Sequence, residues 1–174
     1  LVPEARMPWG GHMALQAMPD VYNALRQARS AIVFVNTRAQ AELCFHALWR
    51  LNDDNLAIAL HHGSLATEQR RKVEAAMAAG RLRAVVATSS LDLGIDWGDV
   101  DLVIHVGAPK GSSRLLQRIG RSNHRLDSPS EALLVPSNRF EVLECEAALQ
   151  AARVNAQDTD YPAVLKLDVL AQHI

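Results

Sequence analysis

The sequence has little cysteine, few aromatic residues and no long apolar run, and each shortage excludes a class of protein. Two cysteines among 174 residues are too few for a disulfide framework. No run reaches the roughly 18 apolar residues of a membrane span, and the N-terminus lacks the charged-then-apolar pattern of a signal peptide. Eighteen basic against nineteen acidic residues give a net charge of −1, which excludes a generally basic nucleic-acid coat. We therefore expect a soluble, cytoplasmic protein with no membrane partner.

Two patterns that hold nucleotides and magnesium are also absent. No segment reads GxxxxGK[ST], the phosphate loop, and no Asp-Glu pair precedes a His or Asp in the arrangement that holds magnesium. The Gly-rich first turn of a small-molecule enzyme on a doubly wound fold is absent as well. A triphosphate bound here would therefore need groups supplied by another domain.

What the sequence does contain is a regular alternation of short apolar runs with segments of helical periodicity. The length suits a single domain. We expect buried strands at Ala31–Asn36, Leu56–His61, Arg83–Ala87, Leu102–Val106 and Ala132–Val135. Helices are expected from Pro19 to about Arg29, and at Arg38–Leu51, Thr67–Ala79, Ser113–Gly120 and Asn138–Ala152. This alternation predicts an α/β fold, a mostly parallel sheet with helices on both faces.

Three of the expected helix ends carry recognisable capping residues. Thr37 with Gln40, and Asn138 with Glu141, have the spacing of capping boxes. Gly80 stands where a helix-ending glycine is expected.

One segment concentrates positive charge. No acidic residue occurs between Asp101 and Asp127, and the arginines of this stretch recur at helical spacings of three and four, at positions 114, 118, 121 and 125. One interpretation is a solvated basic face. The other is a binding site for an anion, either a triphosphate or a nucleic-acid backbone.

Polar residues follow three of the predicted strands. Thr88-Ser89-Ser90 follow one strand, His61-His62-Gly63-Ser64 end a second and Asn36-Thr37-Arg38 end a third. The carboxyl ends of parallel strands meet at one edge of a sheet, where ligands collect. Hydroxyls and backbone amides there can approach a phosphate, although ordinary loops with N-caps would have similar residues.

The histidines and cysteines do not predict a metal site. His61 and His62 are adjacent, so their side chains point in opposite directions on a strand, and no further ligand lies at suitable spacing. Cys44 and Cys145 fall on apolar helical stripes and are expected to be buried and inert.

Taken together, four segments resemble motifs of the second RecA-like domain, the helicase C-terminal domain, of superfamily-2 DExH helicases. Within that superfamily they resemble the large helicase-related family, in particular its bacterial ligase-associated branch. In chain order the segments are FVNTRAQAE (Phe34–Glu42), LHHGSL (Leu60–Leu65), VVATSSLDLGIDW (Val85–Trp97) and QRIGRSNHR (Gln117–Arg125). PWGGHM (Pro8–Met13) resembles the link that enters the domain. The resemblance covers nearly the whole chain, about residues 8–150, and implies a RecA-like fold.

The two ends differ from the rest of the chain. Residues 1–18 include two prolines and a Gly-Gly pair before Pro19, so we expect a lead-in linker. Residues 19–153 would form the RecA-like domain. Residues 154–174 turn polar and then apolar, and we expect them to begin a following domain.

The resemblance implies roles for particular residues. Arg121 corresponds to the arginine finger, which reaches the γ-phosphate held by a first RecA-like domain of the same chain. Many relatives have a second arginine three residues after the finger, where this chain has His124, and Arg125 is the candidate for that contact. Around the nucleotide it implies Gly94, Asp96, Gln117 and Arg118. Along one nucleic-acid strand it implies Thr37, Arg38, His62, Gly63, Ser64, Thr88 and Ser89.

The function implied is an ATP-dependent helicase that moves 3′ to 5′ along single-stranded DNA and displaces a paired DNA or RNA strand. ATP and Mg²⁺ would be held mainly by the first RecA-like domain, so the chain alone would be inactive. The implied partners are single-stranded DNA or a DNA/RNA hybrid, a DNA ligase and a repair nuclease, in a bacterial nucleoid. A non-catalytic nucleic-acid-binding module of the same fold and a small-molecule enzyme are the alternatives.

Overall fold

The computed structural model describes residues 9, 11, 14–91, 100–119 and 131–153, and these form a parallel sheet covered by helices on both faces. The sheet has five strands in the order β2-β3-β1-β4-β5, and every neighbouring pair is parallel. The strands are β1 (Ala31–Val35), β2 (Ile58–His61), β3 (Ala84–Ala87), β4 (Leu102–Val106) and β5 (Glu131–Val135). The predicted fold class is therefore confirmed.

The central strand β1 fixes the position of its neighbours. All five of its residues are fully buried, as expected of a parallel strand with helices on both faces. Phe34 is aligned with Ala87 of β3 on one side and with His105 of β4 on the other. The carboxyl ends of β2, β3 and β1 consequently lie side by side.

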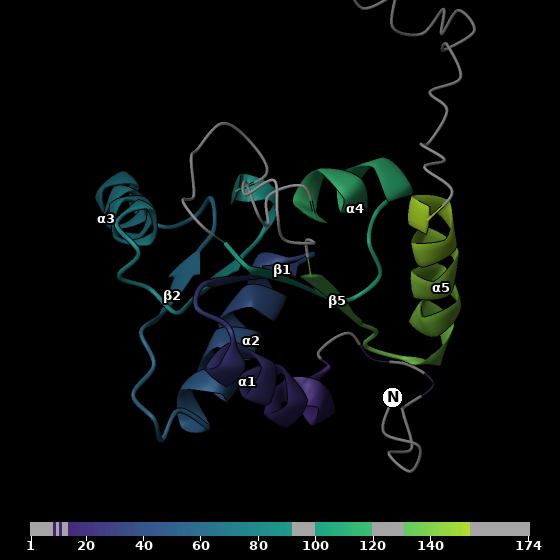
Figure 1. Ribbon diagram of the computed structural model, residues 1–174, viewed down its shortest axis with the longest axis horizontal. Coiled ribbons are helices and arrows are strands. Elements are labelled where there is room, and N and C mark those ends of the chain that lie inside the picture. Colours follow the sequence, from purple (N-terminus) through teal and green to yellow (C-terminus); the bar gives the residue numbers. More distant parts are fainter. Residues whose placement is uncertain (1–8, 10, 12–13, 92–99, 120–130, 154–174) are drawn as a thin grey trace, which may run out of the picture.

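The helices form two layers, as Figure 1 shows. In chain order they are α1 (Met18–Gln27), α2 (Arg38–Arg50), α3 (Thr67–Ala78), α4 (Ser112–Ile119) and α5 (Arg139–Arg153), with short 3₁₀ helices η1 (Leu15–Ala17) and η2 (Ser89–Leu91). α1 and α2 pack on the face that carries Val33 and Val35. α3 and η2 pack on the opposite face, against Ile32 and Phe34. α5 packs against α4 beyond the β5 edge.

The element boundaries lie within two residues of those expected from the sequence. Among the strands, β2 differs most, since it begins two residues later than expected. The Asn52 side chain donates to the carbonyl of Leu56 at 2.9 Å and accepts from its amide at 2.8 Å. These bonds hold Leu56 in the preceding turn, so the strand begins at Ile58. None of the helices in the described ranges has the length and apolar character needed to cross a bilayer.

Candidate nucleic-acid and nucleotide site

Polar residues from three strand ends lie at one edge of the sheet. Thr37 and Arg38 follow β1, the 62–64 segment follows β2, and Thr88 and Ser89 follow β3. Gly63, Ser64 and Ser89 are exposed, as are Thr37 and Arg38, while Thr88 is half-buried. Six of the seven residues expected to contact nucleic acid therefore offer a hydroxyl, a guanidinium or an uncovered backbone at this edge. His62 differs, since only 3% of it is exposed.

The segment after β1 is held by hydrogen bonds of Gln40 and Asn36. The Thr37 hydroxyl caps α2 by accepting from the amide of Gln40 at 3.2 Å, and Gln40 Oε1 accepts from the amide of Asn36 at 3.0 Å. Asn36 Nδ2 donates to the carbonyl of Ala108 beyond β4 at 2.9 Å. Gly107 has φ +91°, and a Cβ there would lie 2.8 Å from Asn36 Nδ2, so this approach requires glycine. The position of Thr37 and Arg38 is thus fixed from both β1 and β4.

A single carboxylate links Arg38 to His62. Glu42 Oε1 accepts from Arg38 Nε at 2.9 Å and lies 3.5 Å from His62 Nε2. The Arg38 guanidinium holds the pKa of Glu42 below its ordinary value. Glu42 was not among the residues expected from the sequence, although its spacing of four from Arg38 on a helix is a recognisable ion-pair signal.

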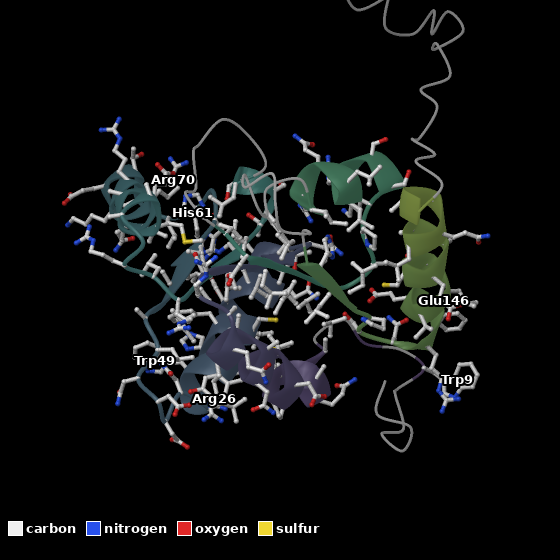
Figure 2. The ribbon with its side chains drawn as sticks, in the orientation of Figure 1. Trp9, Arg26, Trp49, His61, Arg70 and Glu146 are labelled. Atoms are coloured by element: carbon white, nitrogen blue, oxygen red, sulfur yellow. The ribbon has the colours of Figure 1, made fainter. Side chains whose placement is uncertain are left out.

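A second chain of hydrogen bonds runs under the ends of β2 and β3. His61 is fully buried beside α3 (Figure 2), with Nε2 at 2.9 Å from Glu74 Oε1 and Nδ1 at 3.0 Å from the Ser90 hydroxyl. The Ser90 hydroxyl lies 3.3 Å from that of Thr88. These hydrogen bonds connect α3 to Thr88, a candidate contact to nucleic acid. No pattern in the sequence predicted the contact between Glu74 and His61.

The two candidate nucleotide residues of α4 have different surroundings. Gln117 is exposed, whereas Arg118 is 3% exposed. The Arg118 guanidinium lies over the Phe34 ring, 4.4 Å from its centroid, and bonds His105 Nε2. Because His105 Nδ1 lies 3.0 Å from the carbonyl of Gly107, the neutral Nδ1–H tautomer satisfies both bonds.

The expected basic face is therefore interrupted. Arg114 is exposed, but Arg118, four residues later, lies on the buried side of α4 with Leu115. A solvated basic face running through all four arginines is wrong for Arg118, because packing on Phe34 encloses it. Arg121, Arg125, Gly94 and Asp96 lie outside the described residues.

The described residues contain no group of three or more His, Cys, Asp or Glu side chains that could hold a metal ion. Cys44 and Cys145 are buried, as predicted, and burial raises the pKa of their thiols to about 12 and about 11. The thiols are therefore protonated at neutral pH and unreactive.

Comparison with known proteins gives the chain a family. The model of the helicase conserved C-terminal domain matches residues 14–125. The chain belongs to this family. The match includes every candidate nucleotide and nucleic-acid residue named above.

The relatives of this helicase C-terminal domain are named Lhr helicases, which is the large helicase-related group that the sequence resembles. The ATP-dependent helicase Lhr-Core of Methanocaldococcus jannaschii is 37% identical over 158 residues, covering 88% of this chain and 18% of that protein. The Lhr helicase/probable uracil glycosylase of Mycolicibacterium smegmatis is 48% identical over 113 residues, covering 65% and 8%. The chain thus spans about a fifth or less of the length of these relatives.

Solved structures agree with the fold. The Mycobacterium smegmatis helicase Lhr bound to single-stranded DNA and AMP-PNP matches with a TM-score of 0.82 and 39% identity, over 90% of this chain and 21% of that one. The C-terminal domain of the DEAD-box protein Dbp5 matches with a TM-score of 0.67 and 19% identity, covering 97% and 94%, and so supports the fold alone.

Proposed function

We propose that this chain is the second RecA-like domain of an ATP-dependent helicase that moves 3′ to 5′ along single-stranded DNA and displaces the DNA or RNA strand paired with it. The observation that carries the proposal is the edge where β2, β3 and β1 end, with exposed hydroxyls, a guanidinium and a glycine side by side. A related helicase with 39% identity was solved with single-stranded DNA and AMP-PNP, which supports binding of single-stranded DNA and a nucleotide by the helicase that contains this domain.

On the nucleic-acid side, this edge would grip the phosphates of one strand. Arg38 supplies a planar cation, while the Ser64, Thr88 and Ser89 hydroxyls supply short donors. Such contacts hold a backbone without distinguishing bases. We therefore expect binding that depends on salt far more than on sequence.

On the nucleotide side, Arg121 would act as the arginine finger and Arg125 as a second cation. Gly94, Asp96 and the exposed Gln117 would contact the nucleotide, and the enclosed Arg118 would support α4 from inside. Mg²⁺ and most of the triphosphate would be held by a first RecA-like domain of the same helicase, and not by the residues of this domain. ATP bound between the two domains would favour closure of the cleft between them, and this domain would contribute Gln117 and Arg121 to that cleft.

The decisive experiment uses the two-domain helicase with Arg121→Ala and Arg121→Lys. A finger stabilises charge that develops during phosphoryl transfer, so turnover should fall by far more than about tenfold while DNA affinity changes little. Lysine should not rescue, because a point charge does not reproduce the planar fork. DNA-stimulated ATP turnover and single-strand affinity are measured together, with Arg114→Ala on the exposed side of α4 as the matched control.

Two results would contradict this proposal. If turnover survives in Arg121→Ala while DNA binding collapses, Arg121 is a strand contact. If the helicase binds DNA but wild-type ATP turnover does not respond to it, the non-catalytic binding module is the better description. The ligase and nuclease partnerships and the bacterial ligase-associated branch stay predictions.

A further inference from the structure

Glu42 contacts two residues of the candidate nucleic-acid site, Arg38 and His62, where a negative charge would oppose a phosphate. It comes one helical turn after Arg38 on α2, and its Oε1 atom accepts the Arg38 Nε hydrogen bond at 2.9 Å. The same oxygen lies 3.5 Å from His62 Nε2. Two basic side chains that follow different strands, β1 and β2, therefore converge on one carboxylate oxygen.

The surroundings of His62 make this convergence more than a surface ion pair. Its ring is 4% exposed, and neither ring nitrogen has a hydrogen-bond partner among the described residues. Buried polar groups without partners are rare and costly, so such a group calls for an explanation. The His62 imidazole lies within ion-pair distance of the Glu42 carboxylate.

The local electrostatics favour an anion at this point. The hydrogen bond from Arg38 lowers the pKa of Glu42 most, and partial burial opposes it. The charges of Arg38, His62 and His46 lower the pKa further. The groups that act on this carboxylate by charge are all basic, which is also the environment that binds a phosphate.

We propose that the Glu42 carboxylate competes, within the protein, with a phosphate of the bound nucleic acid for the Arg38 guanidinium. Without a strand, Arg38 is paired with Glu42. When a phosphate arrives, the guanidinium exchanges one anion for the other, and the return of Arg38 to Glu42 assists release. Glu42 thereby lowers the affinity of the domain for single-stranded DNA and raises the rate at which the DNA dissociates. The proposal rests on the function above, since it requires Arg38 to contact the strand.

A positioning role for Glu42 would have the opposite effect on affinity. If the carboxylate served only to orient Arg38, its loss would weaken strand binding. Glu42→Gln separates the two roles, because the amide oxygen still accepts from Arg38 Nε while the negative charge is removed. A neutral acceptor binds a guanidinium less strongly than a carboxylate does, so Arg38 would be easier to transfer to a phosphate.

The experiment measures single-strand affinity and dissociation rate in the two-domain helicase, with a polythymidine oligonucleotide at several salt concentrations. Glu42→Gln should tighten binding by about 3–10-fold, mainly through slower dissociation, as expected for one nearby surface charge. The control is Glu68→Gln, which removes an equal charge from an i,i+4 pair with Lys72 on α3 and should change affinity less than about twofold. In an Arg38→Ala background, the gain from Glu42→Gln should largely disappear.

The possible results separate the inference from the function on which it rests. Weaker binding by Glu42→Gln would overturn the inference and make Glu42 a positioning residue. An equal gain with and without Arg38 would also overturn it, since the effect would then be general repulsion. If Arg38→Ala alone leaves affinity and its salt dependence unchanged, Arg38 does not contact the strand, and both the strand assignment and the inference fail. Arg38→Ala should make affinity less dependent on salt, because one phosphate contact is lost. If it does so while Glu42→Gln gives no gain in affinity, only the inference is overturned.

Discussion

At the scale of single residues, the guanidinium of Arg118 is enclosed between the Phe34 ring and the His105 imidazole. A buried cation is costly unless its hydrogen bonds and its packing compensate for lost hydration. Here the aromatic face and the ring nitrogen supply both kinds of contact. The arrangement ties α4 to β1 and β4, directly before the segment that contains Arg121.

Replacing Arg118 with Ala should therefore destabilise the domain. The change removes the packing on Phe34 and leaves His105 Nε2 without this donor, so we expect the free energy of unfolding to fall by about 2–4 kcal/mol. Chemical denaturation followed by circular dichroism measures this. Arg114→Ala, at an exposed position of the same helix, should change stability by less than about 0.5 kcal/mol. Equal losses in the two variants would contradict the enclosed guanidinium.

At the scale of elements, two helices begin with the same arrangement. In α2 the N-cap is Thr37, and in α5 Asn138 Oδ1 accepts from the amide of Glu141 at 3.0 Å. The side chains of Gln40 and Glu141 accept from the amide one residue before the cap, at 3.0 and 2.7 Å. The sequence predicted both capping boxes from residue spacing. It did not predict that the return bond goes to the preceding amide.

The end of α3 provides a test of helix capping. Gly80 has φ +66°, its amide donates to the Met77 carbonyl at 2.8 Å, and the Arg81 amide donates to the Ala76 carbonyl at 2.9 Å. This is the Schellman arrangement, in which a left-handed residue satisfies the last carbonyls. Gly80→Ala should lower stability by about 1–2 kcal/mol through strain, since space for a Cβ is available.

A thermal melt compares Gly80→Ala with Gly80→Asn, which tolerates the left-handed conformation better and should lose less. A variant with alanine as stable as the parent would show that residue 80 changes its backbone conformation at little cost.

At the scale of the whole molecule, the sheet should be the most stable part. β1 is fully buried between β3 and β4, whereas α5 packs mainly on α4 at the β5 edge. Local opening requires little free energy where few buried contacts are lost. In native-state hydrogen exchange, we expect the amides of β1 to exchange only through global unfolding and those of α5 to exchange much faster. Equal protection of α5 and β1 would contradict this order.

Much of this architecture follows from local patterns in the sequence. Apolar runs such as Leu102–Val106 have the length and flanking residues of buried strands, and this strand has the predicted bounds. The shared edge of polar residues follows from parallel strand order. Contacts between distant residues do not follow, because a helical spacing that places Arg118 beside other arginines says nothing about the Phe34 ring that covers it. The approach of His62 Nε2 to the Glu42 carboxylate, at 3.5 Å, could not be predicted for the same reason.

The contact between the start of the described chain and α5 has a consequence for folding kinetics. Asn138 Nδ2 donates to the carbonyl of Gly11 at 2.8 Å across 127 residues of sequence, and the Arg139 guanidinium lies over the Trp9 ring at 4.6 Å. Figure 2 shows Trp9 at the base of α5, on the outside of the molecule. Closing so long a loop is entropically unfavourable before the sheet exists. The contact should thus form after the rate-limiting step, so that weakening it speeds unfolding and leaves the refolding rate unchanged.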